Sequence, residues 1–385
     1  MSSQANVLFL ASWYPTTENP THGIFIQNHA KALALYTPVT VVYAYSTHLP
    51  TTGEIQIKKE GNLTELILPY PKSKLDLPFL KQYSQFSNFK LAYKLLLEKL
   101  IQLQIKVKAI QVNVAFPASI ALPLFIEHFK VKHTIMEHWS GYLKEDGNYR
   151  GTVMRHFTKK CFNHCSKIYY VSERQKESLI HHGLSGNFEL IYNAIDTSIF
   201  KPLPTETKTR TTFLHVSSLV EREKNLSGTF KALKIIQDKG FDVELVIIGG
   251  NADSIKDSKV LQNEIGLNNV TYLGYKTKNE IAEQMNKSDA LILFSNFEGM
   301  PVVALEALAC GLPVLASDVG QLPNMITSKF GKLAQRNNIE EFAIVLEQFI
   351  AGKFTFDKTK MREFILQHAS YEAVGKQLQA YYQTV

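Results

Sequence analysis

One stretch of the sequence, residues 289–313, constrains the fold more than any other. Its first part, DALILFS, is an apolar run of strand length, and the rest has the pattern of a loop that leads into a helix. Pro301 is expected to be the first helical residue, because its missing N–H would have no partner there. Gly311 and Pro313 are expected to end the helix. Such strand–loop–helix units build α/β folds with parallel sheets.

Two glutamates flank the predicted start of this helix. Residues 298–302 lie where free backbone N–H groups and the helix dipole favour an anion. Glu306 stands among alanines and leucines, where a carboxylate is costly to bury without hydrogen-bond donors, and a hydroxyl-rich ligand would supply such donors. Together with Glu298, this arrangement fits a sugar joined to a phosphate. A helix with one solvent-facing glutamate fits the spacing equally well.

The pattern E-x7-E followed by A-x-G-x-P-V resembles the signature of the retaining GT-B glycosyltransferases of the family 4 group, also called glycosyl transferases group 1. The resemblance implies an α/β fold of two doubly wound, Rossmann-like parallel-sheet domains that face a central cleft. It implies that Glu298 is catalytic and faces the donor sugar, and that Glu306 holds the ribose hydroxyls. The donor diphosphate would meet the helix start at Gly299, Met300, Pro301 and Val302.

A chain of 385 residues is too long for one ordinary core, so two domains are expected. Residues 1–202 are predicted to form an N-terminal, acceptor-side domain, and residues 209–364 a C-terminal domain that binds the nucleotide sugar. The polar, proline-bearing segment 202–212 is predicted to be the linker. By resemblance, the C-terminal helix at 365–385 packs back on the N-terminal domain.

Apolar runs predict the strands of both domains, with helices between them. The predicted strands are residues 5–12, 39–45, 109–116, 132–141 and 166–173 in the first half, with strand-like pieces at 54–58 and 64–69, and residues 212–218, 242–250, 269–275, 290–295 and 313–317 in the second half.

The N-terminal half offers five candidate site residues. Gly23 lies in the loop after the first strand, and it matches a family glycine that lets the backbone approach the donor or acceptor. His138 follows an apolar strand, at the edge where α/β sheets bind ligands, and resembles the family histidine that contacts the donor sugar near the reacting carbon. Glu137 beside it either orients the loop or meets the acceptor. Asn193 and Asp196 match the family segment at the end of this domain, or simply fix a tight turn.

The C-terminal half offers the groups that would hold the nucleotide. Lys224 matches a family lysine, but the arginine that the family has six residues earlier is Ser218 here, so Arg222 is a candidate replacement. The nucleobase is expected near Gly250 and Tyr275. The chain contains no D-x-D pair, so we predict a metal-independent enzyme in which protein cations and N–H dipoles stabilise the leaving diphosphate.

Charge and composition limit the partners and the compartment. Residues 1–200 contain 21 Lys and Arg against 14 Asp and Glu, which accounts for the whole net charge of +7. This excess suits an anionic acceptor or an anionic membrane surface, and an ordinary solvated basic face is the alternative. The amphipathic segment 79–105 is open to the same two interpretations, membrane surface or core-facing helix. No nucleic-acid partner is expected.

The N-terminus shows no signal peptide, and no apolar run is long enough to span a bilayer. Three cysteines make no disulfide framework and no Cys/His quartet for a metal, so we expect them to be reduced and buried. We therefore expect a cytoplasmic protein, with the inner face of the membrane as a second location.

The expected activity is transfer of a sugar from a nucleotide diphosphate sugar to a glycan or lipid-linked glycan. No cofactor is expected, and the donor is expected to be a UDP-sugar. A double displacement needs a carboxylate beside the anomeric carbon, whereas the resemblance places Glu298 on the sugar hydroxyls and favours front-face substitution. The alternatives are a sugar-nucleotide epimerase or phosphorylase on the same frame, and a sugar-nucleotide-binding protein without catalysis, which the missing arginine suggests.

Overall fold

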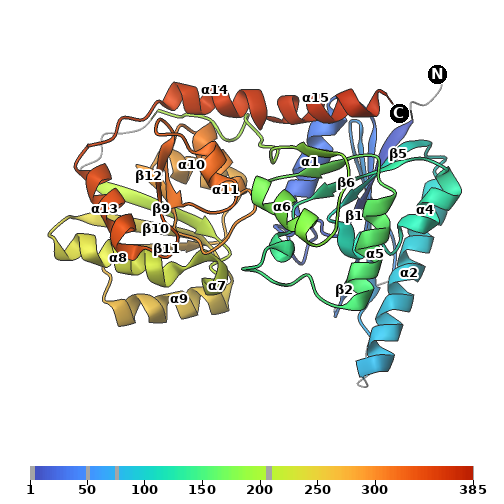
Figure 1. Cartoon of the computed structure of the whole chain (residues 1–385), viewed down its shortest axis with the longest axis horizontal. Coiled ribbons are helices and arrows are strands. Elements are labelled where there is room, and N and C mark those ends of the chain that lie inside the picture. The colour runs from blue at the N-terminus through green and yellow to red at the C-terminus, as the bar shows by residue number, and fades with distance from the viewer. Residues whose placement is uncertain (1–4, 49–52, 74–77, 205–209, 385) are drawn as a thin grey trace. The chain divides into compact units, whose positions relative to one another are not determined.

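The computed structural model describes residues 5–48, 53–73, 78–204 and 210–384. These form two compact units, each with its own sheet and core (Figure 1). The N-terminal unit comprises residues 1–171, 175–194 and 371–385, and the C-terminal unit comprises residues 172–174 and 195–370. The centre of the predicted linker, residues 205–209, and the predicted domain start at residue 209 lie outside the described residues.

The N-terminal unit is built around an eight-stranded sheet of order β3-β4-β2-β1-β5-β6-β7-β8. All neighbouring strands are parallel except the edge pair β3–β4, which is antiparallel. The strands are β1 (Asn6–Ala11), β2 (Val39–Thr47), β3 (Gln56–Glu60), β4 (Leu63–Pro71), β5 (Val107–Asn113), β6 (His133–Glu137), β7 (Ile168–Tyr170) and β8 (Phe188–Leu190).

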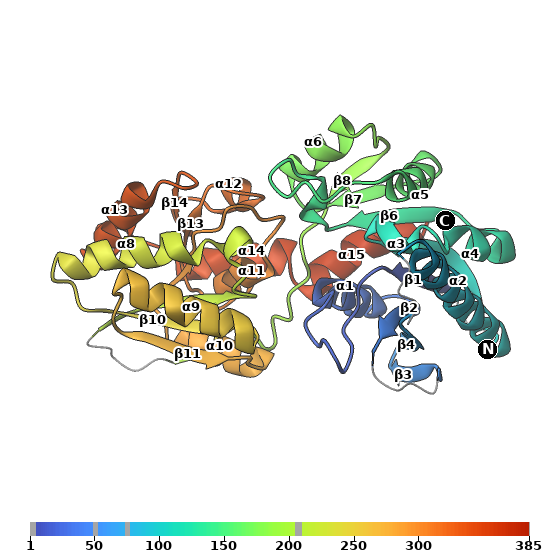
Figure 2. The ribbon, with the colours of Figure 1, turned by 90° about the horizontal axis from the view of Figure 1, so that it is seen from below.

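Helices cover both faces of this sheet (Figure 2). They are α1 (Ile24–Ala34), α2 (Pro78–Gln102), α3 (Ala115–Ala118), α4 (Leu122–Phe129), the 3-10 helix η1 (Ser140–Tyr142), α5 (Thr152–Asn163), α6 (Glu173–His181) and α15 (Tyr371–Tyr382). Helix α2 buries one face, including Tyr93 and Leu96, in the core, as a core-facing helix does. Helix α15 packs on α1, where a side chain at Gly375 would lie 2.1 Å from the carbonyl oxygen of Ala32, so only glycine permits the contact.

The C-terminal unit has a six-stranded, fully parallel sheet of order β11-β10-β9-β12-β13-β14. Its strands are β9 (Thr211–Ser217), β10 (Val243–Gly249), β11 (Val270–Gly274), β12 (Ala290–Leu293), β13 (Val314–Ser317) and β14 (Gly331–Ala334). Its helices are α7 (Glu221–Lys224), α8 (Leu226–Asp238), α9 (Ala252–Ile265), α10 (Lys278–Asn286), α11 (Val302–Ala309), α12 (Leu322–Met325), α13 (Ile339–Ile350) and α14 (Lys358–His368).

The strand order reverses at the first strand of each sheet. Strand β1 separates β2 from β5, and β9 separates β10 from β12. Loops that leave the carboxyl ends of neighbouring strands diverge at such a switch point, which is where open α/β sheets bind ligands. The predicted α/β fold of two doubly wound sheets is therefore confirmed, and each unit offers one such edge. None of the described helices is both long enough and apolar enough to cross a membrane.

The structure corrects several details of the sequence-based prediction. Strand β14 was not predicted, and the predicted C-terminal helix is two helices, because the carbonyl of Ala369 accepts the N–H of Ile195 instead of continuing the helical pattern. Pro301 is the N-cap of α11 and not its first helical residue, with an extended ψ of 115°. Gly311 follows the helix with φ +73°, as expected for a terminating glycine.

Candidate active site

In the C-terminal unit, Glu298 and Lys224 meet directly. Lys224 at the end of α7 donates a hydrogen bond from Nζ to Glu298 Oε1 at 2.8 Å, and the two side chains are 17% and 9% exposed. Ser295 donates to the same carboxylate oxygen at 2.8 Å, and its own carbonyl accepts the hydroxyl of Ser317 at 2.6 Å. Two residues that are 74 apart in sequence thus form a charge pair at the strand ends.

A buried histidine below this pair orders the loop after β9. His215 Nδ1 lies 3.0 Å from the carbonyl of Ile292, and Nε2 lies 2.8 Å from Ser217 Oγ, which also accepts the N–H of Leu219. The Nδ1 atom therefore carries the proton, and Nε2 accepts from the serine. Burial lowers the pKa of His215 to about 4, and the Lys224 ammonium acts in the same direction, so the ring stays neutral.

The loop that carries Glu298 is held by a glycine opposite it. Gly320 has φ +58°, and a side chain there would lie 2.3 Å from the carbonyl oxygen of Gly299 and 2.5 Å from that of Glu298. The neighbouring N–H of Gln321 donates to the carbonyl of Gly299 at 2.8 Å. Within this loop, Met300 and Pro301 are buried, and Val302 is the first residue of α11. The carbonyls of Glu298 and Gly299 are therefore packed against the segment at Gly320 and Gln321.

Glu306, one turn into α11, is partly buried and has no hydrogen-bond or ion-pair partner among the described residues. Burial raises the pKa of its carboxyl from 4.5 to about 7, and Lys278 on α10 only partly opposes this shift. A carboxylate without donors in such a place is destabilising by itself. The side chain is not directed freely into solvent, and no protein group in the described part of the chain binds either oxygen.

Ser218, which stands in place of the family arginine, is exposed and carries no charge. Two cations lie near by. The Arg222 guanidinium stacks over the ring of Phe297 at 5.6 Å, directly before Glu298. Arg336 donates to the carbonyl of Asn296 at 3.4 Å. Both arginines therefore border the loop that carries Glu298, and Arg336 was not predicted because it follows the unpredicted strand β14.

The two positions predicted for the nucleobase lie at the ends of β10 and β11. Gly250 has φ +74°, and a side chain there would lie 2.6 Å from Leu219 and 2.8 Å from Ser254, so its open side is filled by protein. Its neighbour Gly249 is needed for packing too, since a side chain there would lie 2.0 Å from the carbonyl oxygen of Ser217. Tyr275 is 58% exposed and presents a ring after β11.

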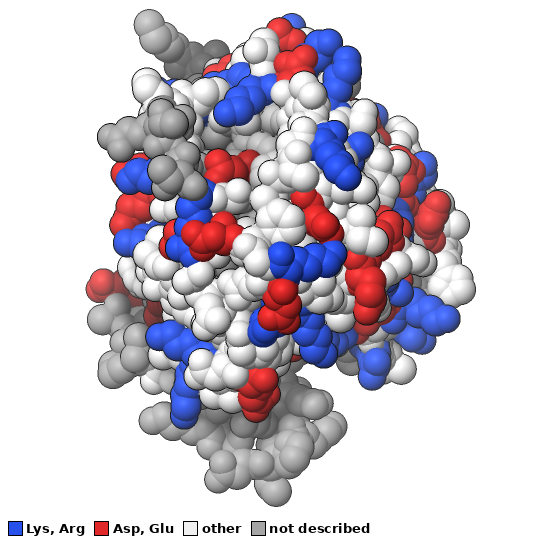
Figure 3. Space-filling view, turned by 90° about the vertical axis from the view of Figure 1, so that its left-hand side faces the viewer, with Lys and Arg blue, Asp and Glu red and all other residues white. Residues whose placement is uncertain are grey.

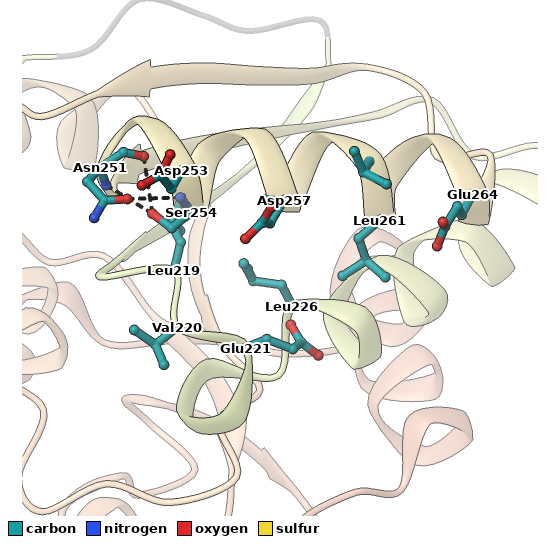
Figure 4. A pocket seen from close by; sticks show the side chains of 12 residues that line it. Leu219, Val220, Glu221, Leu226, Asn251, Asp253, Ser254, Asp257, Leu261 and Glu264 are labelled. Carbon is teal, nitrogen blue, oxygen red and sulfur yellow. Dashed lines mark hydrogen bonds between the residues drawn. The ribbon is translucent and has the colours of Figure 1, made fainter.

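A pocket of about 630 Å³ lies beside Gly250, between α9 and the segment from Leu219 to Leu226 (Figure 4). Leu219, Leu226 and Leu261 form its apolar side, and the capping box of Asn251 and Ser254 closes one end. Its charged lining groups are all carboxylates: Glu221, Asp253, Asp257 and Glu264. Such a lining repels a diphosphate, so the anionic part of a nucleotide is better matched by the loop with Lys224.

In the N-terminal unit, Gly23 is the N-cap of α1 with φ +67° and ψ +23°. A side chain there would lie 2.6 Å from the carbonyl carbon of Trp13. The backbone that approaches this glycine is therefore that of the preceding loop. Trp13 in turn lies 6.5 Å from Trp139, ring centroid to ring centroid, so the loops after β1 and β6 meet at this edge.

His138 lies directly after β6, buried between two rings. Its ring centroid is 4.4 Å from that of Phe25 and 5.1 Å from that of His29, both on α1. Neither ring nitrogen has a hydrogen-bond partner of ordinary geometry among the described residues. Burial and the neighbouring His29 hold the pKa of His138 well below 6.5, while Asn193 acts in the opposite direction. The imidazole is therefore neutral at pH 7.

The structure decides between the two roles left open for Glu137. The carboxylate is fully buried and accepts four hydrogen bonds from protein groups. It therefore orients the loop and has no access to an acceptor. Asn193 is buried as well, and Asp196 caps its own turn by accepting from Ser198.

No group of three or more His, Cys, Asp and Glu side chains in the described part of the chain is arranged to hold a metal ion. The three cysteines are free thiols, and Cys161 and Cys310 are buried as expected, whereas Cys165 is partly exposed.

The face in Figure 3 carries Lys and Arg interspersed with Asp and Glu, without a large area of one sign.

Sequence reasoning missed the groups that support the candidate residues. His215 lies within β9, Ser295 shortly after β12 and Ser317 at the end of β13, and single serines and histidines in such places have no distinctive pattern. Gly320 lies in an ordinary loop sequence, and only its contact with the 298–299 carbonyls shows its importance. The candidate residues Lys224, Glu298 and Pro301 are brought close together within one unit, whereas Gly23 and His138 belong to the other.

Together, the two doubly wound sheets and the loops at their switch points define an α/β fold of the GT-B class. Two family models match the chain: one described as Glycosyltransferase Family 4 over residues 39–199, and one described as Glycosyl transferases group 1 over residues 197–365. The chain therefore belongs to the family 4 group of GT-B glycosyltransferases, and it is a glycosyltransferase.

Curated relatives support the same family. An uncharacterized glycosyltransferase of Methanocaldococcus jannaschii is 28% identical over 264 residues, which are 68% of this chain and 70% of that protein. The lipopolysaccharide 1,6-galactosyltransferase of Escherichia coli is 28% identical over 200 residues, 50% of this chain and 54% of that protein, so the match spans about half of that relative.

Solved structures support the fold along the whole chain. Sucrose-phosphate synthase from Thermosynechococcus elongatus has a TM-score of 0.77 at 19% identity, over 99% of this chain and 98% of that one. The Anabaena protein HepE in complex with UDP-glucose has a TM-score of 0.73 at 14% identity, over 99% of this chain and 100% of that one.

Proposed function

We propose that the protein transfers a sugar from a UDP-sugar to a hydroxyl of a glycan or lipid-linked glycan, with retention and without a divalent metal. The observation that carries this proposal is the partly buried carboxylate of Glu306, which has no hydrogen-bond or ion-pair partner among the described residues and lies one turn into the helix that follows the loop of Glu298. Glu298 itself pairs with Lys224. The family resemblance and the UDP-glucose complex of the HepE neighbour favour a nucleotide sugar as the donor.

Glu306 is proposed to bind the ribose. The two adjacent hydroxyls of a ribose donate two hydrogen bonds to one carboxylate, which would supply the donors that this side chain lacks. Binding in the ionised form would also bring the pKa of the carboxyl down from about 7.

The diphosphate is proposed to lie between Lys224 and the N-terminus of α11. An ammonium has three N–H donors, and one is used by Glu298, so Lys224 is able to bind a phosphate oxygen while it keeps this pair. The first turn of α11 adds backbone N–H groups and a favourable dipole around Gly299 and Val302. Arg222 or Arg336 is proposed to supply the charge that Ser218 lacks.

Glu298 and His138 are the proposed catalytic residues. With one carboxylate oxygen bound by Lys224 and Ser295, Glu298 is suited to hold sugar hydroxyls and poorly suited to attack the anomeric carbon. This favours front-face substitution, in which the leaving phosphate oxygen takes the proton of the acceptor. His138 is neutral, and its ring nitrogens have no hydrogen-bond partner of ordinary geometry among the described residues; it is proposed to contact the donor sugar near the reacting carbon.

The acceptor is proposed to bind the N-terminal unit near Gly23 and His138. The relative from Escherichia coli is named for lipopolysaccharide, which favours a bacterial glycan or lipid-linked glycan. Helix α2 exposes Leu91 and Leu95 beside Lys90 and Lys94, which suits the cytoplasmic face of an anionic membrane. Co-sedimentation with phosphatidylglycerol vesicles, and not with phosphatidylcholine vesicles, would support this location.

A thermal-shift screen over UDP-, GDP- and ADP-sugars, followed by a turnover assay, tests the proposal. We expect stabilisation by a UDP-sugar, and slow hydrolysis or transfer that persists in EDTA and disappears in Glu298→Ala and Glu306→Ala. The anomeric configuration of the product, read by NMR, tests retention. A protein that binds sugar nucleotides but never turns one over would instead be a binding protein without catalysis, and a donor converted to its isomer would indicate an epimerase.

A further inference from the structure

We propose that Glu137 is a positioning residue for sugar transfer: its buried carboxylate fixes the turn of His138 and Trp139, and it acts on the reaction only through that turn. The inference rests on the proposed role of His138. It concerns a buried acidic group that the proposed mechanism does not otherwise use.

The carboxylate of Glu137 is saturated by four protein donors. Oε1 accepts the backbone N–H of His138 and that of Trp139, both at 3.0 Å. Oε2 accepts the backbone N–H of Ala115 at 3.0 Å and the hydroxyl of Tyr142 at 3.1 Å. The side chain is 0% exposed, so neither oxygen remains for a substrate.

The ionised form of the carboxyl suits all four partners. Three of them are backbone N–H groups, which only donate, and the Tyr142 hydroxyl donates to the ionised carboxylate, although a hydroxyl is able to accept as well. Burial raises the pKa of the carboxyl, and the four hydrogen bonds oppose that shift. None of the four partners is a cation, and the charge is therefore held by neutral N–H and O–H dipoles alone. A residue that served packing alone would have no need of a buried charge, which is costly to desolvate.

His138 depends on this turn more than most histidines depend on their backbone. Its ring nitrogens make no hydrogen bond of ordinary geometry among the described residues, although Asn193 acts on the ring, and its backbone N–H is held by Glu137. Packing by Phe25 and His29 holds the ring once the Cα–Cβ direction is set. Rotation of the turn would therefore move the imidazole away from the position at which the donor sugar is expected.

The backbone N–H of Trp139 donates to the same oxygen, Oε1 of Glu137, and the residues around the Trp139 ring leave little room for another conformation. A side chain at Gly141 would lie 2.1 Å from Cε2 of the Trp139 ring, so the indole rests directly on the glycine. Tyr142 and Trp13 contact the same ring edge-on, at centroid distances of 5.3 and 6.5 Å. Since the chain contains only two tryptophans, emission from a Trp13→Phe background reports Trp139 alone.

The test compares Glu137→Gln with Tyr142→Phe, each in wild-type and Trp13→Phe backgrounds. The amide turns one acceptor oxygen into a donor that faces donors, whereas Tyr142→Phe removes one bond to Oε2 and leaves both Oε1 bonds. For the sugar nucleotide that the wild type turns over, we expect Glu137→Gln to lower kcat about 100-fold, because a displacement near 1 Å has that effect, with KM changed by less than about threefold. Tyr142→Phe should keep kcat within about threefold.

Trp139 emission should shift in Glu137→Gln and not in Tyr142→Phe. An unchanged kcat in Glu137→Gln, or equal losses of kcat in both variants, would overturn the proposal. If Glu137→Gln does not fold, amide hydrogen exchange of the wild type decides. Slow exchange of the His138 and Trp139 amides supports their hydrogen bonds to Glu137, and fast exchange refutes the proposal. If the wild type turns over no sugar nucleotide, the proposed function fails, and the emission and exchange measurements still decide on Glu137.

Discussion

Two partly or fully buried glutamates, one in each unit, differ in how their charge is satisfied. Glu137 at the end of β6 has four protein donors around its carboxylate. Glu306 in α11 has no hydrogen-bond or ion-pair partner among the described residues, and burial raises its pKa to about 7. Glu137 ends β6, which neighbours β5, and Glu306 lies in the helix that follows β12, the neighbour of β9. Their sequence contexts, an acidic residue in an apolar element, are alike.

The difference separates a carboxylate that organises protein from one that is left for a ligand. Alteration of a saturated carboxylate is strongly destabilising, because its buried donors lose their acceptor. A buried carboxylate without donors lowers the stability of the folded protein. Natural selection keeps such a residue where it is needed to bind a ligand. Removal of each side chain should therefore have opposite effects on folding, and only one should affect nucleotide binding directly.

The largest expected effect is on nucleotide affinity. Glu306→Ala should weaken UDP binding about 100-fold, since two hydrogen bonds to a charged carboxylate contribute on the order of 3 kcal/mol together. Isothermal titration calorimetry with UDP measures this. Glu283→Ala on α10, an exposed glutamate paired with Lys287, is the control and should bind like the wild type. Equal affinity in all three proteins would remove the ligand role from Glu306.

Stability should change in opposite directions at the two sites. At pH 8, Glu137→Gln should lower the free energy of unfolding by about 3 kcal/mol, because buried donors lose their acceptor. Glu306→Gln should raise it by about 1 kcal/mol, because an uncompensated charge is removed. Urea unfolding followed by tryptophan emission reports the N-terminal unit, and circular dichroism reports both units. Destabilisation of similar size in both variants would contradict the proposed difference between the two glutamates.

A pair of glycines extends the comparison to the backbone. Gly23 and Gly274 have φ of +67° and +66°, but a side chain at Gly23 meets Trp13 while one at Gly274 meets nothing within 4 Å. Both alanine variants carry the cost of a left-handed residue, about 1 kcal/mol. Gly23→Ala should lose about 2 kcal/mol more than Gly274→Ala, measured by urea unfolding. Equal losses would mean that the backbone contact at Trp13 relaxes freely.

The smallest expected effect is a pH dependence that Glu306 alone produces. In the unfolded chain this carboxyl ionises near 4.5, and in the folded protein near 7. Between these values the folded state holds the extra proton, so wild-type stability falls relative to Glu306→Gln as the pH rises from 4.5 to 7, and the difference is constant above that. Since this side chain is only partly buried, we expect about 1 kcal/mol. Unfolding free energies from pH 4 to 8 provide the measurement.

Much of the fold followed from apolar periodicity. The strands from 5–12 to 313–317 were located because parallel strands buried on both faces are continuous apolar runs. Strand β14 was missed, since GKLA is short and half polar. The antiparallel edge β3 also escaped a precise prediction, because every residue in it is exposed and it lacks an apolar pattern.

The candidate site was predicted less completely. The motif located Glu298, Glu306 and Lys224. The residues that surround the pair of Glu298 and Lys224, namely Ser295, Ser317 and His215, have no local signature. The role of Gly23 was predicted from its loop position, and the structure shows that its empty side faces the Trp13 backbone.

By itself the sequence determined the two parallel-sheet units and the loop at which α11 begins, since these depend on the polarity and spacing of neighbouring residues. Tertiary structure alone decided which acidic group is satisfied. The donors to Glu137 include the N–H of Ala115, 22 residues away, while nothing in the described chain comes within bonding reach of Glu306. Hydrogen-bond satisfaction depends on groups that only folding brings together, and no local pattern records it.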